Sequence, residues 1–503
     1  MAGVSMTGEL KVGMSKTGLR AAVVLLLMVI CTSCGQTYRP VATPISPNPP
    51  NPNFAHLELV LSGNGADHPG ASTAIDVSGD TAVSQSTVGL MPVHATAAQN
   101  GFRVYVANSG DGTVSTFSPS TPTPVTTVSL PAGPFAAFPV FVHTTQSDVV
   151  WVADAANNRV DGILTLNPVV AYQVAVGTNP VALAETPNQL KLYAANMGTG
   201  GSGGSVTSIN PGDRSVNPPI GNATWVSPVS VVARSDSGRV YVLDQGNGLV
   251  SAIDTSSDSV VNSVSVGVGV NFMRYDPTRN RLYVSNPAAN TVTYLDASND
   301  ALSPVVIPVA NPISVAALPD GTRAYVTSAS VSGGNVTSRV TVINASDGSI
   351  RSTIPLTTAA QVCASNPFEL SIAAAADSSR VYVGNCDVGN VAIIQTSNDT
   401  LLLQMPAPVS AAQPSTVDIA GATQSGSNTT YAYTLISGAP LRVGMSIAIQ
   451  SMEDSGNDGT FTITAVGTGT FTVRNTSGVT ATSQRGTGTA VTPQNPVFVV
   501  VGT

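Results

Sequence analysis

Few residues in this chain have the type and spacing that chemistry would require. The histidines are scattered, at His56, His68, His94 and His143. They lie at different distances from the aromatic residue that follows them, so they do not occupy one repeated place. A metal site or an acid–base pair needs further partners that the sequence does not nominate, and no nucleophile, zinc-protease or phosphate-loop motif occurs. We therefore predict no catalytic, cofactor-binding or metal-binding residues.

One acidic loop is a partial exception. The stretch Glu453-Asp454-Ser-Gly-Asn457-Asp458-Gly459 could hold a calcium ion through oxygen ligands. Its spacing does not fit the calcium loop of helix–loop–helix proteins, and the same residue types favour turns. We favour a solvated turn.

Two of the four cysteines lie far along the chain, at Cys363 and Cys386. Cys386 ends a predicted strand, and Cys363 lies just before the strand that precedes it. Antiparallel pairing places the start of one strand beside the end of the next, so the sequence predicts a disulfide between them. Closing such a loop stabilises the folded state by on the order of 3 kcal/mol, and the oxidising environment of an exported protein permits the bond. The alternative is two separate buried thiols.

The start of the chain predicts export. Basic residues precede an apolar run of 11 residues, Ala21 to Cys31, which is short for a membrane span and typical of a secretory signal. The following Thr32-Ser33-Cys34-Gly35 is similar to a bacterial lipoprotein signal, although Cys31 stands where an aliphatic residue is usual. The resemblance implies cleavage after residue 33 and lipidation of Cys34. Residues 34–54 then form a proline-rich tether. The alternative is simple export, with a periplasmic or secreted protein.

Composition excludes some partners. Charged residues make up only 10% of the 503 residues, and the net charge is −8. Nucleic acid requires a basic face, so we exclude it as a partner.

A short phrase, an apolar run around an aromatic residue followed by a polar turn, recurs along the chain. The seven aromatic residues are Tyr105, Trp151, Tyr193, Tyr241, Tyr283, Tyr325 and Tyr382, at intervals of 46, 42, 48, 42, 42 and 57 residues. Several short strands repeating at this period indicate a β-propeller of four-stranded blades. In one unit, the strands are predicted at residues 228–233, 239–243, 249–253 and 260–266. Phrases such as Arg-Val-Tyr382-Val-Gly-Asn resemble the YVTN family of propeller repeats over residues 55–412.

An eighth unit precedes the first aromatic copy. Ser72-Thr-Ala-Ile-Asp76 parallels Val250-Ser-Ala-Ile-Asp254, and upstream we place Val60 in the aromatic position. The missing first strand is supplied by Pro496 to Gly502, within a closing segment at 495–503. Closure by both ends removes exposed strand edges. We therefore predict eight blades; the alternative is seven. Residues 415–490 break the period and predict a small all-β module.

The polar residues that recur have structural explanations. Six of the seven aromatic strands are followed by Asn or Asp, with Ser328 as the exception, and these residues favour turns. The arginines before four of the tyrosines are expected to pair between blades, with a functional basic ring as the alternative: Arg239, Arg281, Arg323 and Arg380. First strands carry mostly Val, Ala and Ser. The sequence thus favours a monomeric, non-catalytic envelope lipoprotein, anchored to the outer membrane or cell surface by its lipid, whose propeller binds a surface protein or glycan. The alternative is an enzyme of the lactonase or quinoprotein-dehydrogenase type, which the family resemblance implies.

Overall fold

The computed structural model describes residues 57–501, apart from short gaps at 64–68, 99–102, 120–124, 145–147, 219, 221–224, 361–369, 407–414, 439, 442, 444 and 492–494. The predicted signal peptide and tether, with Cys34, His56 and His68, lie outside the described residues, as does Cys363. Among the residues that are described, no helix has the length and apolar character needed to span a bilayer.

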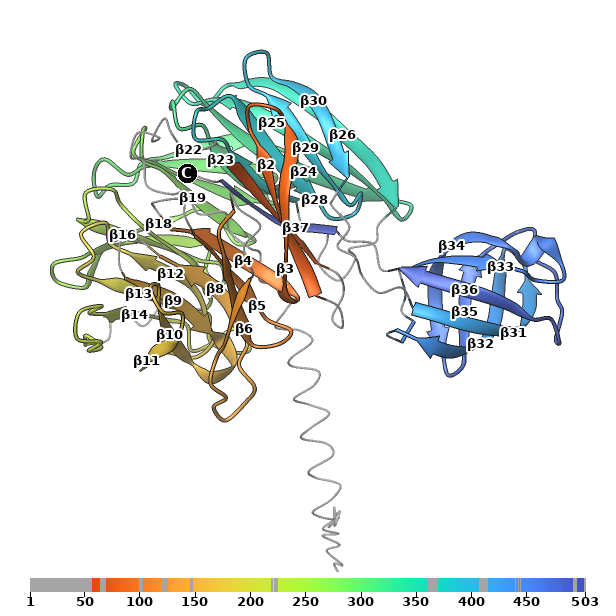
Figure 1. Cartoon of the computed structure of the whole chain (residues 1–503). Helices are drawn as coiled ribbons and strands as arrows, with labels where there is room; N and C mark the ends of the chain where they lie inside the picture. The colour runs from red at the N-terminus through yellow and green to blue at the C-terminus, as the bar shows by residue number, and fades with distance from the viewer. Residues whose placement is uncertain are drawn as a thin grey trace, which may run out of the picture. The chain divides into compact units, whose positions relative to one another are not determined.

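The propeller has eight blades, each an antiparallel sheet, as predicted (Figure 1). From inner to outer strand, blade 1 is β37 (Asn495–Val501), β1 (Leu57–Gly63), β2 (Pro69–Asp76) and β3 (Thr81–Leu90); blade 2 is β4 (Pro92–Ala97), β5 (Val104–Asn108), β6 (Thr113–Phe117) and β7 (Thr126–Ser129); blade 3 is β8 (Pro139–His143), β9 (Val149–Asp154), β10 (Arg159–Leu164) and β11 (Val170–Ala175); blade 4 is β12 (Pro180–Glu185), β13 (Leu192–Asn196) and β14 (Ser205–Ile209). Blade 5 is β15 (Pro228–Ala233), β16 (Arg239–Asp244), β17 (Leu249–Asp254) and β18 (Ser259–Ser265); blade 6 is β19 (Phe272–Asp276), β20 (Arg281–Asn286), β21 (Thr291–Asp296) and β22 (Pro304–Pro308); blade 7 is β23 (Pro312–Ala317), β24 (Arg323–Ser332), β25 (Asn335–Asn344) and β26 (Ile350–Ala360); blade 8 is β27 (Leu370–Ala374), β28 (Arg380–Asn385), β29 (Asn390–Gln395) and β30 (Thr400–Pro406).

Blade 4 differs from the predicted four strands. Its sheet has three strands, and only a single bridge between Ile209 and Val216 marks the place of a fourth. Proline has no N–H to donate to a ladder. Pro218 lies two residues after Val216 and cannot donate to a continued ladder.

The ring is closed by its last strand, as predicted. β37 pairs antiparallel with β1 and also contacts the inner strands β27 and β4 on either side of it. The other inner strands contact their neighbours in the order β4, β8, β12, β15, β19, β23 and β27. Closure therefore leaves β1 paired on both of its edges, with β2 on one side and β37 on the other.

The register in blade 1 corrects one prediction. Tyr241 pairs with Ala252 in the phrase Val-Ser-Ala-Ile-Asp254, and the matching alanine of blade 1, Ala74, pairs with Leu59. Leu59, not Val60, therefore occupies the aromatic position. A shift of one residue turns a strand's side chains to the opposite faces, so this moves Val60 to the other side of the blade.

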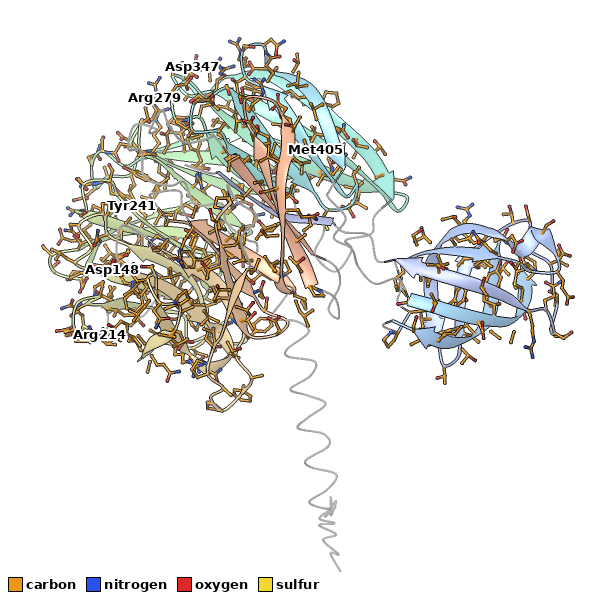
Figure 2. All side chains as sticks on the ribbon, viewed as in Figure 1. Asp148, Arg214, Tyr241, Arg279, Asp347 and Met405 are labelled. Carbon is orange, nitrogen blue, oxygen red and sulfur yellow. The ribbon has the colours of Figure 1, made fainter. Side chains whose placement is uncertain are left out.

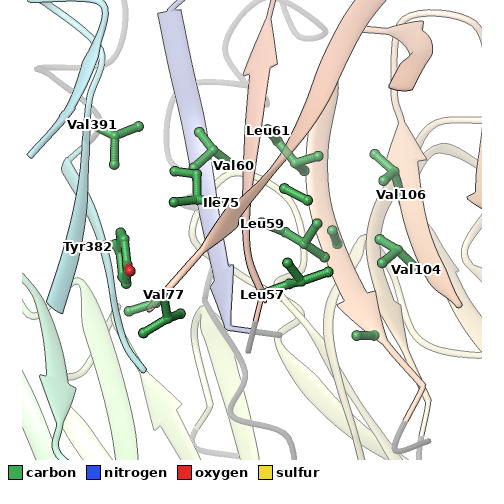
Figure 3. Packing of buried hydrophobic residues seen from close by; sticks show 14 of the residues in the cluster. Leu57, Leu59, Val60, Leu61, Ile75, Val77, Val104, Val106, Tyr382 and Val391 are labelled. Carbon is green, nitrogen blue, oxygen red and sulfur yellow. The ribbon is translucent and has the colours of Figure 1, made fainter. Parts of the chain in front are cut away.

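An apolar cluster fills both sides of the closing blade. Figure 3 shows Leu57, Leu59 and Leu61 on the side of Val104 and Val106 of blade 2, whereas Val60 lies toward blade 8, where Tyr382 and Val391 belong to the same cluster. These labelled side chains are buried. Burying one such side chain contributes about 1.5–3 kcal/mol, so packing here stabilises the junction between the two ends of the chain.

The second module is a closed six-stranded barrel, built within the predicted segment. Its strands are β31 (Ser415–Ser425), β32 (Asn428–Ser437), β33 (Ser446–Gln450), β34 (Gly459–Gly467), β35 (Thr470–Arg474) and β36 (Gly486–Val491), in the order β31-β32-β35-β34-β33-β36. β36 closes the barrel by pairing with β31. Its core contains Tyr431 and Phe471, whose rings stack with centroids 5.2 Å apart.

Candidate functional site

The Asn and Asp residues that end the second strands fix the surrounding turns, as predicted. Asp244 is fully buried and accepts hydrogen bonds from the backbone N–H groups of Val226 and Ser227, at 2.9 and 2.8 Å. Asn286 likewise donates to the carbonyl oxygens of Val266 and Val268. Their side chains join the loop that enters a blade to the turn between its second and third strands. These polar groups stabilise the loops instead of forming a ring of ligands.

Three of the four arginines predicted to pair between blades, Arg239, Arg323 and Arg380, do pair with an aspartate of the next blade. We call the contact between two neighbouring blades a seam, and an ion pair across it a latch. Each latch joins the start of a second strand to the turn between the third and fourth strands of the next blade. The latches are Lys191 with Asp258 in seam 4/5, Arg239 with Asp300 in seam 5/6, Arg323 with Asp399 in seam 7/8 and Arg380 with Asp80 in seam 8/1, at 2.6, 2.7, 2.5 and 3.1 Å.

A tyrosine hydroxyl completes three of the latches by donating to the same aspartate. The pairs are Tyr193 with Asp258, Tyr325 with Asp399 and Tyr382 with Asp80. The repeated aromatic residue therefore does more than fill the core. It also supplies a hydrogen bond to the carboxylate of the next blade, and a buried hydroxyl that is hydrogen-bonded avoids the cost of desolvation.

Seam 6/7 departs from this pattern. Gly348 occupies the place in the turn of blade 7 where the other latches have aspartate. Arg281 instead donates to the carbonyl oxygen of Ala345, and its guanidinium lies 4.3 Å from the ring centroid of Tyr294. Asp347 of the same turn is exposed at the periphery of the ring (Figure 2).

The inner strands carry ionisable residues that the sequence analysis did not single out as a group. They are His94 on β4, His143 on β8, Glu185 on β12, and Arg274 and Asp276 on β19. The expectation of mostly Val, Ala and Ser on first strands is therefore incomplete. Their signal was present in the sequence, since each sits on a strand whose equivalents in other blades are small or apolar.

The two described histidines serve as hydrogen-bond acceptors. His94 stacks on Phe141 with ring centroids 3.9 Å apart, and its Nδ1 accepts from the backbone N–H of Val142. His143 Nε2 accepts from the backbone N–H of Glu185 at 3.1 Å. Burial lowers the pKa of His143 to about 4, which favours the neutral imidazole. A neutral ring held in this way contributes to the structure of seams 2/3 and 3/4.

Glu58 is a charged residue type in an apolar position. Both of its carboxyl oxygens are buried and have no hydrogen-bond partner among the described residues. Burial raises its pKa well above the ordinary value of 4.5. The register aligns Glu58 with residues that are apolar in the other seven blades: Val104, Val150, Leu192, Val240, Leu282, Ala324 and Val381.

The acidic loop of the barrel is organised by its own backbone. Asp454 accepts from the N–H of Gly456, and Asp458 accepts from the N–H of Met452, at 3.0 and 2.9 Å. Asn457 is fully buried and bonds both backbone groups of Val479. These contacts support a structured turn. Across the described part of the chain, no three His, Cys, Asp or Glu residues gather in a way that could hold a metal.

Cys386 is buried and disulfide-bonded. Its expected partner, Cys363, lies outside the described residues, so the pairing stays a prediction.

Comparison with known proteins shows the fold alone. No family model and no curated protein matches the chain. Among solved structures, it is similar to the dihydro-heme d1 dehydrogenase NirN in complex with DHE, with a TM-score of 0.54 and 12% identity over 74% of this chain and 78% of that one. It is also similar to apo AztD from Citrobacter koseri, with a TM-score of 0.52 and 10% identity over 70% and 95%. At such identities, a shared propeller says nothing about shared activity.

Proposed function

We propose that this protein is a non-catalytic binding scaffold of the bacterial cell envelope, built on YVTN-type repeats and anchored by a lipid on Cys34. The observation that carries this proposal is how the repeated polar residues are used. The latch residues and the Asn and Asp residues bond within the ring. The groups that recur among the blades therefore support the ring, and specificity is left to residues that differ between blades.

A scaffold of this kind presents surfaces of low charge. Only 10% of the residues are charged, so uncharged polar residues must supply much of the hydrogen bonding on the surface. Such groups hydrogen-bond neutral polar partners without the salt dependence of charged surfaces. This supports a surface protein or a glycan as the partner.

The anchor is tested by Cys34→Ser in a bacterial host. We expect the wild-type chain in the membrane fraction, carrying the mass of a diacylglycerol-type lipid on its new N-terminus, and the variant in the soluble fraction. Cys31→Ser is the matched control and should leave the lipid in place. A Cys34→Ser chain that stays in the membrane fraction would contradict the lipid anchor.

The binding role is tested on intact cells. Photo-crosslinking from the anchored chain should yield a defined protein or glycan adduct, and the same adduct should form with the purified full chain in detergent. If neither crosslinking nor a glycan array gives a saturable partner, the scaffold proposal loses its support.

A further inference from the structure

Seam 8/1, between the last blade and the first, contains several buried polar side chains that lack hydrogen bonds. They are Glu58, Ser62 and Thr73 of blade 1 and Ser371 of blade 8. Their side-chain oxygens have no hydrogen-bond partner among the described residues. A buried polar group without a partner is costly, so this seam is weaker than its apolar packing alone implies.

The three side chains of blade 1 share the face that is turned toward blade 8. Val60 lies toward blade 8 (Figure 3), and Glu58 and Ser62 are two residues to either side of it on β1, so they have the same orientation. Thr73 is the Cα partner of Val60 in the β1–β2 ladder and therefore lies on that face as well.

Ser371 lies on the opposing face of blade 8. It is two residues before Ala373, which is the Cα partner of Tyr382 and belongs to the same apolar cluster. Its equivalent in blade 7, Ser314, donates to the carbonyl oxygen of Leu370 across seam 7/8 at 2.6 Å. Seam 8/1 therefore lacks a hydrogen bond that the preceding seam has.

Seam 8/1 also differs in how the chain crosses it. At the other seven seams, the chain passes directly from the outer part of one blade to the inner strand of the next. Between β30 of blade 8 and β37 of blade 1, it passes through all strands of the barrel. No short connection therefore ties blade 8 to blade 1.

Glu58 is the one member of this polar set that can carry a charge. No cation is available to it, because the Arg380 guanidinium is held by Asp80 and by the carbonyl oxygen of Ser379, each at 3.1 Å. Burial without a partner disfavours the ionised form, so the carboxyl keeps its proton while the seam is closed.

Few other ionisable groups face Glu58. From blade 8 they are Tyr382 and Arg380, and Asp80 joins them from the turn after β2. Asp76 of β2 pairs with Leu57 and so lies on the opposite face of blade 1. The sequences of β27, β29 and β37 contain no ionisable residue.

We propose that seam 8/1 is the place where the ring opens, and that loss of the proton from Glu58 drives the opening. In the closed state, blades 8 and 1 pack together around the neutral carboxyl. In the open state, β37 and β1 remain paired and move away from blade 8, which brings the carboxylate into water. The inference is independent of the lipid anchor and of any surface partner.

The direction of the pH dependence follows from where the proton is held more tightly. Below about pH 4.5, both states keep the proton, and the balance between them does not change with pH. Above it, only the closed state does, so each further pH unit favours the open state by up to about tenfold, until the carboxyl ionises in the closed seam as well.

The test measures access to the seam through single cysteines in the purified full chain in detergent. Val391→Cys places a thiol on the face of blade 8 that is turned toward blade 1, and Val250→Cys places one at the equivalent residue of blade 5, facing seam 5/6. Labelling by a methanethiosulfonate reagent is followed from pH 5 to pH 8. Each rate is divided by that of a peptide of the same sequence, which removes the effect of thiol ionisation, and the wild type gives the background.

We expect the corrected rate of Val391→Cys to rise by up to about tenfold per pH unit and that of Val250→Cys to stay constant. Addition of Glu58→Gln, which cannot ionise, should remove the rise at residue 391. Addition of Glu185→Gln, at a buried glutamate of blade 4, should leave it unchanged. If Glu58→Gln does not fold, Glu58→Val takes its place.

Three results would overturn the proposal. The first is a corrected rate of Val391→Cys that does not change with pH. The second is a rise that persists when Glu58 is replaced. The third is an equal rise at Val391→Cys and Val250→Cys, because the pH dependence would then belong to unfolding of the whole ring and not to seam 8/1.

Discussion

Arg380 and Asp80 are 300 residues apart in sequence, yet the Arg380 Nε lies 3.1 Å from Asp80 Oδ2. Tyr382 donates to the same carboxylate at 3.3 Å. This latch joins the last blade to the first. It uses the same residue types as the latches between blades that are consecutive in sequence. The seam that closes the ring therefore has the same kind of contact as the other latched seams.

The closing latch is expected to contribute to stability. Asp80→Asn keeps a residue that tolerates the positive φ of 50° and removes the charge. Because Arg380 would lose its buried partner, we expect the free energy of unfolding to fall by about 1–3 kcal/mol. Urea unfolding measures the change.

The matched control for that change is Asp347→Asn, in the corresponding turn of blade 7, which makes no latch. It should change the free energy of unfolding by less than about 0.5 kcal/mol. Equal effects of the two variants would show that the latch charge is not the cause.

Removal of the closing strand tests the ring itself. A chain ending at residue 494 leaves β1 with an unpaired edge, and such edges invite pairing between molecules. We expect a loss of about 3 kcal/mol or more in the free energy of unfolding, together with aggregation that depends on concentration.

A synthetic peptide of residues 495–501 should restore the unfolding midpoint of this truncated chain. The same peptide with Val499→Pro, which cannot donate to the ladder with Val60, should not. Unchanged unfolding of the truncated chain would show that β37 is dispensable.

We expect that position 162 must be glycine because two aromatic rings pack against it. A Cβ on Gly162 would lie 2.9 Å from Cζ3 of its Cα partner Trp151 and 2.9 Å from Cδ2 of Tyr172. Gly162→Ala should therefore cost about 1–3 kcal/mol through overpacking.

Other blades indicate the compensating change, because Tyr241 faces Ala252 in the same pairing. The double variant Trp151→Tyr with Gly162→Ala should recover the part of the loss that is due to Trp151, while the contact with Tyr172 remains, and a double-mutant cycle in urea measures the coupling. Additive losses would contradict the steric explanation.

Glu58 predicts an unusual dependence of stability on pH. The unfolded chain ionises this carboxyl near pH 4.5, whereas burial raises its pKa in the folded chain well above that value. Above pH 4.5 the folded chain therefore holds the proton more tightly, and stability falls as pH rises toward the folded pKa, by up to about 1.4 kcal/mol per pH unit. The charge of Glu58 acts on Tyr382, whose hydroxyl donates to Asp80 of the closing latch.

Glu58→Val places in blade 1 the residue found at Val240 and Val381. In urea unfolding experiments, the free energy of unfolding of this variant should exceed that of the wild type by an amount that grows between pH 5 and pH 8. Glu58→Gln, which cannot ionise, should flatten the pH dependence as well. If the difference in the free energy of unfolding between Glu58→Val and the wild type does not change with pH, ionisation of Glu58 is not its cause.

The blade count and the closing strand could be predicted because they depend on spacing. The position of Leu59 could not be fixed as easily, since Leu59 and Val60 are both apolar and no aromatic residue marks the register. The register follows from the phrase Ser72-Thr-Ala-Ile-Asp76, because its alanine, Ala74, pairs with Leu59. Closure of the barrel was missed because β36, Gly486–Val491, is rich in glycine and threonine and has little apolar content.

The contacts of the inner-strand ionisable residues could not be predicted for a different reason. Each of these residues differs from its small or apolar equivalents in the other blades, so the residues themselves can be found in the sequence. Their partners cannot, because His143 and Glu185 are 42 residues apart and meet only where β8 and β12 are neighbours around the ring.

The pairing of β37 with β1 also sets an order of assembly. Blade 1 is the first to begin as the chain emerges, and it is the last to be finished, after the whole barrel module has been made. Blades 2 to 8 can form before residues 495–501 are made, so β1 keeps an unpaired edge until those residues arrive. The barrel, inserted just before them, therefore delays the moment at which the ring closes.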